Sequence, residues 1–290
     1  MAETTTTTSA AFLGEEWTDY TIDAVQFEMV LQDTVRHVGP QEVKGNRTIH
    51  VPHFSNLTAN TKTQGTDVTY EAITQTNQDI TINTWRYVAI EVNSLVEVQS
   101  RYDLIDENAG RMGYALARGF ETDLAALPQN LSVTYGNYGV EMNEDDFNAV
   151  VVLLDNAGAK QDGRVWWASP AFVANMRKID KFTSRDFVQG ANASAVEKAT
   201  MGMLFNGKVI QSPLLRSPSA GQHDNAFFQR DQLIMVMQMP PKTEHMRIID
   251  SLTDAVVAHA IHTVAEAEIP AEAAGSESLG DSLGVLVKSV

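Results

Sequence analysis

One apolar stripe constrains this chain more than any other feature of its sequence. From Leu104 onward, apolar side chains recur at steps of three and four residues, which is the spacing of one helical face. Asp103 and Asp106 suit the positive end of a helix, and Pro128 stops the pattern after Leu127. We therefore predict one helix of about 24 residues and about 36 Å, roughly twice the usual length. Its apolar face is Leu104, Ile105, Ala109, Met112, Leu116, Phe120 and Leu124, and its solvated charges are Arg101, Asp103, Glu107, Arg111, Arg118 and Glu121.

The segment in front of this helix has the period of a β-strand. Ile80 and Ile82 alternate with polar residues, and the same alternation continues through Val88, Ile90 and Val92. We therefore predict a long strand that leads almost directly into the long helix.

This order of elements resembles the major capsid proteins of tailed bacteriophages, which share the Hong Kong 97-type fold. In that family a strand of a projecting hairpin, the E-loop, leads through a polar turn with a Gln-Ser pair into a long spine helix. Gln99, Ser100, Asp103 and Leu104 stand at the matching positions of this chain, whereas Asn93 stands where an Asp is common.

Two shorter motifs add to the resemblance. The segment GRVWWASPAFVANMRK predicts a buried strand at residues 164–168, and Ser169-Pro170 then opens a short helix that ends near Lys181. A strand that ends in Ser-Pro before a helix is similar to part of the axial domain of these capsid proteins. The pattern G-x-V-x-x-S after a turn is also common in the family, and here Asn206, Gly207, Val209 and Ser212 form it.

Between these motifs and the long helix, a further helix has clear start and stop signals. Asn143 is a good N-cap, and the acidic residues 144–146 lie in the first turn, where the helix dipole favours negative charge. Gly158 suits the end of this helix. Its apolar face consists of Phe147, Val150, Val151 and Leu154.

The first third of the chain is polar. Residues 1–15 are Thr-rich with little to bury, so we expect an arm, and residues 17–38 predict a helix of about four turns. Its apolar side chains near one face are Ile22, Val25, Met29 and Val30.

Residues 47–54 form a short β-type run that Pro52 makes an edge strand or a bend. Residues 56–77 are mostly Thr, Asn, Gln and Asp without apolar periodicity, and with the strand from Asp79 they predict a long, poorly buried hairpin. Two strands alone are marginal in water, so this hairpin needs support from elsewhere.

The C-terminal third is rich in β-type patterns. Residues 233–239 predict a strand that Pro240-Pro241 breaks, and a second strand follows around residues 246–249. Residues 252–268 fit a helix by alanine content or a strand by alternation, and we favour the strand because the resembled family returns to its long sheet here. Residues 269–282 read as a linker, and residues 284–290 as a last edge strand or a disordered tail.

Composition excludes several classes of protein. The net charge of −16, from 37 acidic and 21 basic residues, argues against tight binding of nucleic acid through phosphates. Without cysteine the chain has no disulfides and no thiolate metal site. The sequence has no apolar run long enough to span a membrane, and its start lacks the pattern of a secretion signal.

Each candidate for chemistry has a simpler structural explanation. His259 and His262 would share a face if helical, as metal ligands can, but no third ligand is evident. The acidic residues 144–146 are explained by their place at a helix start, and Ser169 lacks the flanking glycines of a nucleophile elbow.

The remaining candidates are two pairs of residues. We expect His50 and His53 to line a turn, and Trp166 and Trp167 to pack in a core or an interface. We therefore predict no catalytic, cofactor-binding or metal-binding residue.

The resemblance implies a mixed α+β fold of the Hong Kong 97 type. Its expected parts are an N-terminal arm (1–19), a first part of the peripheral domain (20–46), the E-loop (47–83), a second peripheral part with the spine helix (84–136), an axial domain (137–245), a peripheral or axial return (246–269), and a linker with the C-terminal strand or tail (270–290).

The function that the resemblance implies is structural. The chain would assemble into hexamers and pentamers of an icosahedral phage head that encloses double-stranded DNA, in the cytoplasm of a bacterial host. Only about 16 residues precede the first predicted helix, which implies a separate scaffolding protein, and a portal and a cement protein are further expected partners. One alternative is an encapsulin-like shell that encloses enzymes, and another is a soluble hydrolase that uses the acidic residues near Asp145.

Overall fold

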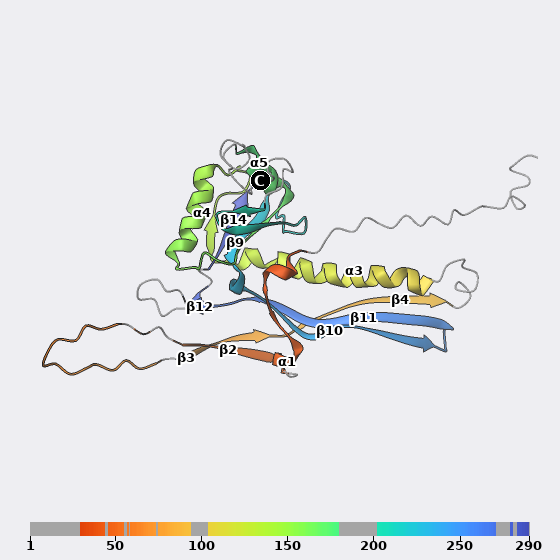
Figure 1. Ribbon diagram of the computed structural model, residues 1–290. Helices are drawn as coiled ribbons and strands as arrows, with labels where there is room; N and C mark the ends of the chain where they lie inside the picture. Colours follow the sequence, from red (N-terminus) through yellow and green to blue (C-terminus); the bar gives the residue numbers. More distant parts are fainter. Residues whose placement is uncertain are drawn as a thin grey trace, which may run out of the picture.

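The computed structural model describes residues 30–43, 46–54, 57, 59–73, 75–93, 104–179, 202–270, 279–280 and 283–289. This part of the chain combines helices with sheets, as expected. The predicted arm at residues 1–19, the predicted helix as far as residue 29, the polar turn with Gln99 and Ser100, and residues 271–278 of the predicted linker lie outside the described residues. Figure 1 shows an elongated molecule, with a compact unit above one end of a long sheet and a hairpin that extends past that end.

The apolar stripe forms the long helix α3 (Leu104–Ala125). Met112, Leu116, Phe120 and Leu124 are buried, which confirms the predicted face where side chains are described. Pro128 lies in a 3-10 turn, Leu127–Asn130, that follows the helix, so the predicted stop is also confirmed.

Helix α3 lies along one face of a long sheet (Figure 1). Among the described residues this sheet has the strand order β1-β10-β11-β4. Its strands are β1 (Arg36–Val38), β4 (Thr84–Asn93), β10 (Leu233–Ile248) and β11 (Thr253–Glu266). Strand β1 runs parallel to β10, and the other two pairs are antiparallel. The strand predicted for residues 252–268 is therefore confirmed as β11.

Two predictions about strand limits were wrong. Pro240-Pro241 does not break β10. The pairing of β10 with β11 shifts in register between Met237 and Lys242, and this irregularity accommodates the prolines. The domain boundary that we predict after residue 245, between the axial domain and the peripheral or axial return, thus falls inside the continuous strand β10. The long strand predicted before α3 is two strands that separate at Ile82-Asn83 and pair in different sheets.

The compact unit is built on a second sheet, with the order β5-β14-β9-β6-β8-β7 in the described part of the chain. Its strands are β5 (Val133–Tyr135), β6 (Arg164–Ala168), β7 (Met203–Leu204), β8 (Gly207–Gln211), β9 (His223–Gln229) and β14 (Gly284–Ser289). Helices α4 (Glu144–Asn156) and α5 (Pro170–Lys178) pack on one face of it.

Strand β14 lies inside this sheet between β5 and β9, so the prediction of an edge strand or a disordered tail was wrong. Its side chains are almost all buried, because Val285 and Val287 pack with α4 and α5 on one face of the sheet and Leu286 packs with α3 on the other. The amide of Asn225 fixes it further, since Nδ2 donates to Ser289 Oγ at 2.9 Å.

The predicted caps of both short helices are confirmed. Asn143 and Asp146 form a reciprocal capping box at the start of α4, and the Ser169 side chain accepts a hydrogen bond from the Phe172 N–H at the start of α5. Gly158 has a φ of 76°, the left-handed conformation that ends many helices.

Strands β7 and β8 form a hairpin through Phe205 and Asn206, which both have positive φ. The turn predicted at Asn206 is thus confirmed. Gly207 has a different role, because a Cβ there would lie 2.6 Å from Trp166 Cδ1.

The projecting hairpin starts from β2 (Thr48–Phe54) and β3 (Gln75–Thr81), which pair antiparallel. Of the predicted run at residues 47–54, Thr48–Phe54 is therefore a strand, and it includes Pro52. The base of the hairpin is fixed to the body by Gln78, whose Nε2 donates to Glu266 O at 2.6 Å and whose Oε1 accepts from Glu268 N at 3.0 Å. The short strands β12 (Ile269–Pro270) and β13 (Leu279–Gly280) pair separately, and the short helix α1 (Pro40–Val43) follows β1.

Residues 30–38 do not continue the helix predicted for 17–38. They form a 3-10 turn, Gln32–Thr34, followed by β1, and we call residues 30–35 the N-terminal turn. Glu121 holds this turn: its Oε1 accepts hydrogen bonds from Leu31 N at 2.9 Å and Gln32 N at 3.2 Å. Glu121 is only 1% exposed, so its predicted solvation was wrong.

The second half of α3 is buried between the two main sheets. Leu116, Phe120 and Leu124 belong to one apolar cluster with residues of both sheets and of the N-terminal turn. The compact sheet contributes Trp167, Phe228 and Leu286 to this cluster. The long sheet contributes Leu233, Met235 and Ala260, and the N-terminal turn contributes Leu31 and Val35.

This packing predicts the effect of a charge on the buried face of α3. Leu116→Asp should lower the free energy of unfolding by about 4 kcal/mol or more, because it places a carboxylate in a dry core. Ala115→Asp is the matched control on an exposed position of the same helix and should cost less than about 1 kcal/mol. Urea denaturation followed by circular dichroism measures both, and equal losses would contradict the assigned helix face.

Candidate functional site

A charged cluster fixes α3 to the long sheet. Arg86 of β4 forms a bidentate ion pair with Asp123 of α3, in which Nε donates to Oδ2 at 2.7 Å. His262 of β11 is buried, and its Nε2 lies 2.8 Å from the same Oδ2. Gly119 leaves room for this pair, because a Cβ there would lie 2.9 Å from Arg86 Cδ.

The cluster perturbs the acid that it contains. Burial by itself would raise the pKa of the Asp123 carboxyl, but the hydrogen bonds from His262 and Arg86 and the charge of Arg86 outweigh burial and lower the pKa to about 2. Asp123 is therefore ionised at neutral pH and links α3 to two strands of the sheet.

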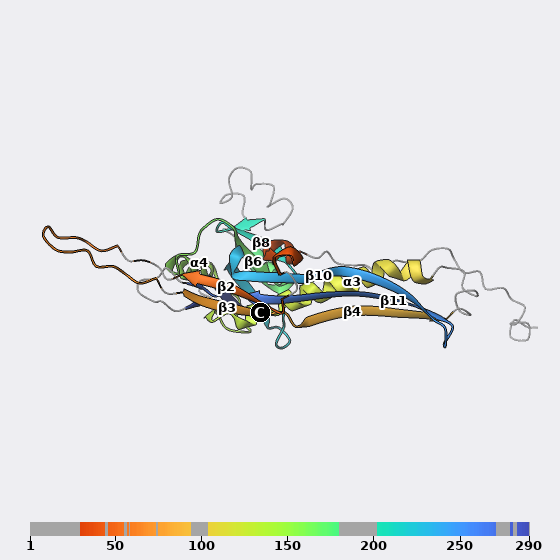
Figure 2. The ribbon, with the colours of Figure 1, turned by 90° about the horizontal axis from the view of Figure 1, so that it is seen from below.

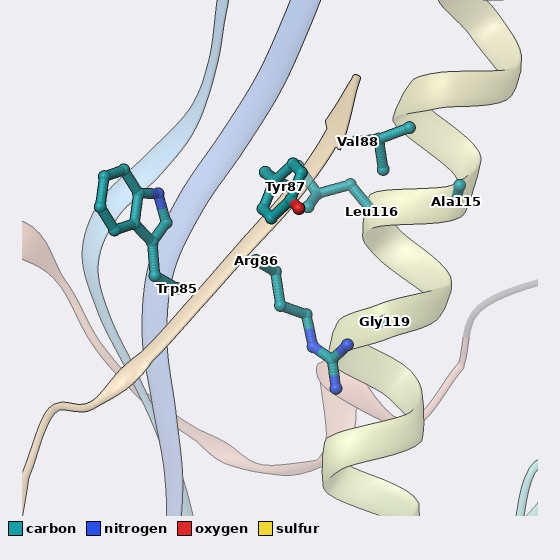
Figure 3. A pocket seen from close by; sticks show the side chains of 7 residues that line it. All are labelled: Trp85, Arg86, Tyr87, Val88, Ala115, Leu116 and Gly119. Atoms are coloured by element: carbon teal, nitrogen blue, oxygen red, sulfur yellow. The ribbon is translucent and has the colours of Figure 1, made fainter. Parts of the chain in front are cut away.

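A shallow groove of about 210 Å³ lies beside this cluster, between α3 and the edge strand β4. Figure 3 shows Arg86 directed toward the helix at Gly119, whereas the Trp85 side chain points to the other side of the strand. Leu116 and Ala115 complete the helix side of the groove, and Val88 of β4 lies on its strand side. Its lining has neither a nucleophile nor a pair of carboxylates, so it does not resemble a catalytic site.

The face of the long sheet opposite α3 exposes large apolar side chains. Trp85 and Tyr87 are 67% and 70% exposed on β4, where they alternate with the half-buried Arg86 and Val88. The register places Ile261 and His259 of β11 beside them. We call this surface, with Met246 of β10, the open sheet face.

The end of the hairpin is a second unsupported surface. Residue 57 and residues 59–73, which we call the hairpin loop, lie beyond the β2–β3 ladder, and their side chains are all exposed. Figure 2 shows this loop extending far past the body of the molecule. Four of its exposed side chains are nevertheless large and apolar: Leu57, Val68, Tyr70 and Ile73.

The loop has little to hold its shape. Among the described residues its internal contacts include a turn in which Thr66 N donates to Thr63 O, and a hydrogen bond from Asn60 Nδ2 to Glu71 Oε1 at 3.0 Å. Tyr70 is 92% exposed, so its ring adds almost nothing to the packing of the described subunit, and exposed apolar groups of this kind mark interaction surfaces.

The structure does not bring the two histidines of β11 together. They lie on a strand, and a separation of three residues directs His259 and His262 to opposite faces. His262 is buried against Phe120, with ring centroids 4.6 Å apart, whereas His259 lies 6.0 Å from the Trp85 ring on the open sheet face. Within the described ranges, no three His, Asp or Glu side chains could hold a metal ion.

The other sequence candidates have structural roles. Asp145 is exposed at the start of α4, and Asp146 accepts a hydrogen bond from the Tyr135 hydroxyl at 2.9 Å in addition to its capping bond. His50 shares a 2.5 Å hydrogen bond with Asp79 across β2 and β3, so the prediction that the His50–His53 segment lines a turn was wrong. Trp166 and Trp167 are fully buried in separate clusters, one on each face of the compact sheet.

Sequence reasoning missed the open sheet face. The signal was present, because the alternation of Val88, Ile90 and Val92 assigns the odd-numbered residues Trp85 and Tyr87 to the other face of β4. None of the described helices has the length and hydropathy that crossing a membrane requires.

Solved structures with the same arrangement of elements come from phages. A structure from Mycobacterium phage Che8 matches with a TM-score of 0.76 at 18% sequence identity, covering 95% of this chain and 97% of that chain. The capsid structure of the cyanophage P-SCSP1u matches with a TM-score of 0.73 at 16% identity, covering 98% and 94% of the two chains. The mature capsid of bacteriophage PhiM1 matches with a TM-score of 0.72 at 13% identity, covering 96% and 92%.

This is the fold of phage capsid chains. The likeness spans nearly the whole of this chain and of these structural neighbours. No protein-family model matches the sequence, and no curated protein is detectably similar to it in sequence. The likeness is therefore one of fold.

The charged cluster predicts how stability depends on pH. The folded-state pKa of Asp123, about 2, lies below the ordinary value of about 3.9, so its contribution is present above pH 4 and lost as the pH falls toward 2. Wild-type protein should lose about 2 kcal/mol more unfolding free energy between pH 5 and pH 2 than Asp123→Asn does.

Chemical denaturation at a series of pH values measures this difference. Asp67→Asn is the matched control, because Asp67 is exposed in the hairpin loop, and it should keep the wild-type pH dependence. If Asp123→Asn also kept it, the cluster would not be what fixes α3 to the sheet.

Proposed function

We propose that this chain is the major capsid protein of a tailed phage, a structural subunit of an icosahedral head built from hexamers and pentamers. The observation that carries this proposal is a capsid fold with an unsupported hairpin loop. The hairpin loop has no ladder of its own, and its exposed Val68, Tyr70 and Ile73 offer apolar contact area to another molecule. In a shell that molecule is the adjacent copy.

The proposed parts follow the Hong Kong 97 arrangement. Helix α3 is the spine helix, the hairpin is the E-loop, the long sheet with α3 is the peripheral domain, and the compact unit is the axial domain that clusters at the centres of hexamers and pentamers. The arm before residue 30 completes the contacts between subunits.

Many weak, repeated contacts are enough for such a shell. Closed symmetry multiplies each interface, and extended segments add contact area without requiring a larger core. The role is therefore structural rather than catalytic, which agrees with the capping roles of Ser169 and of the acidic residues at the start of α4.

The net charge suits a container for double-stranded DNA. At −16 the chain is repelled by phosphates on average, so packed DNA can move without sticking to the wall. The partners of such a head are a separate scaffolding protein, a portal and a cement protein, with assembly in the cytoplasm of the bacterial host.

Serine substitutions in the hairpin loop test this proposal. Replacing Val68, Tyr70 and Ile73 together by Ser should change the free energy of unfolding by less than about 0.5 kcal/mol, because these exposed side chains support nothing within the subunit. The variant should fail to form large particles in velocity sedimentation, under conditions where the wild-type protein forms them.

A matched control uses the same loop and the same number of changes. Thr61, Thr63 and Thr69 are exposed polar residues, and their replacement by Ser should leave assembly intact. Particles of normal size from the Val68, Tyr70 and Ile73 variant would contradict the assigned role of the loop, as would loss of its fold.

A further inference from the structure

A second groove, of about 160 Å³, runs along the side of α3 that faces β10. Its helix side includes Met112, Gly113, Ala117 and Phe120, and its strand side includes Pro241 and Thr243 of β10. The lining is mostly apolar or small and contains no charged side chain. A groove of this kind suits apolar side chains of another protein segment.

The groove is open because α3 does not cover the whole sheet. The helix packs over β4 and β11, so the outer half of β10 has no described element above it, and its residues 240–247 are all exposed. A Cβ built on Gly113 would have no neighbour within 4 Å, which shows that the space beside the helix is free among the described residues. An apolar groove next to an exposed strand is an incomplete core.

The N-terminal turn lies at one end of this groove. Glu121 accepts the backbone hydrogen bond from Leu31, and its neighbour Phe120 lines the groove. Burial raises the pKa of the Glu121 carboxyl, although the backbone amides of the turn oppose that effect. Thr34 adds a second anchor, since its Oγ1 accepts from Trp167 Nε1 at 2.8 Å. Leu31 therefore lies beside the groove, and residues 1–29 precede this point in the sequence.

The sequence of that preceding chain fits the groove. Ile22, Val25 and Met29 recur at helical spacing. A helix over residues 17–29 would be about 20 Å long, enough to cover the roughly 12 Å of α3 between Met112 and Phe120.

We propose that residues 17–29 of the free subunit fold back into this groove of their own chain, with Ile22, Val25 and Met29 against α3 and the outer half of β10. A covalently attached segment has an effective concentration in the millimolar range, so the chain's own arm outcompetes that of a second copy in dilute solution. The proposal concerns the single chain and does not depend on whether the chain builds shells.

Cross-linking tests the location of the arm. The chain has no cysteine, so a Val25→Cys, Ala117→Cys variant contains only two thiols, and a short bismaleimide should link them within one chain. The matched control is Val25→Cys with Ala115→Cys, because Ala115 lines the other groove, beside β4. Intrachain linking should be at least about tenfold faster for the Ala117 pair.

Two results would overturn the proposal: equal rates for both pairs, and links that form only between subunits. The second result would assign the groove to the arm of another copy. Since particle formation is scored separately by sedimentation, a failure here is distinguishable from a failure of the proposed capsid role.

A groove-filling variant provides an independent measurement. Gly113→Leu places a side chain in open space, so the subunit should stay folded while the arm is displaced. Cleavage of the full chain at Glu28 by a glutamate-specific protease should then be at least about tenfold faster than in wild type. Ala115→Leu is the control and should cleave at the wild-type rate, and an unchanged rate in Gly113→Leu would contradict the proposal.

Discussion

The structure depends on how the second half of α3 is buried between two sheets. Leu116, Phe120 and Leu124 share one apolar cluster with Trp167 of the compact sheet and Met235 of the long sheet. Loss of such a side chain typically costs 2–5 kcal/mol, so the position of each sheet is set largely through this helix. Apolar contacts alone would allow the helix to slide or rotate on the sheet. Asp123 of α3 fixes one position of the helix, because it forms an ion pair with Arg86 of β4 and a hydrogen bond with His262 of β11.

The exposed apolar surfaces of the described subunit lie at its periphery, away from this fixed centre. The hairpin loop has no ladder beyond β2 and β3, and the open sheet face exposes Trp85 and Tyr87 at the edge strand β4. A subunit that is rigid in its core and incomplete at its ends can be completed by identical neighbours, and a closed shell repeats the same completion at every position. The acidic composition fits this role as well, because a negatively charged wall can enclose the proposed double-stranded DNA without binding its phosphates tightly.

The sequence predicted those elements whose signal is local. The stripe around Leu116 predicted α3, Asn143 and Gly158 predicted the limits of α4, and Asn206 predicted a turn. Features that tertiary contacts decide were missed. Glu121 looked solvated, because nothing local shows that Leu31, ninety positions away, donates its N–H to that carboxylate. Likewise, Pro240-Pro241 predicts a strand break, because the sequence does not show that the β10–β11 pairing shifts its register around the two prolines. The C-terminal strand β14 looked like an edge, since its two neighbours, β5 and β9, are both distant in sequence.

Electron microscopy of the purified full-length protein, expressed alone and together with its neighbouring genes, tests the central claim most directly. We expect closed shells, or hexameric and pentameric rings where closure needs the scaffolding partner, with the hairpin loop of each subunit lying on the next. A protein that stayed monomeric under both conditions would contradict the capsid role, because the exposed apolar side chains of the hairpin loop would then have no partner to cover them.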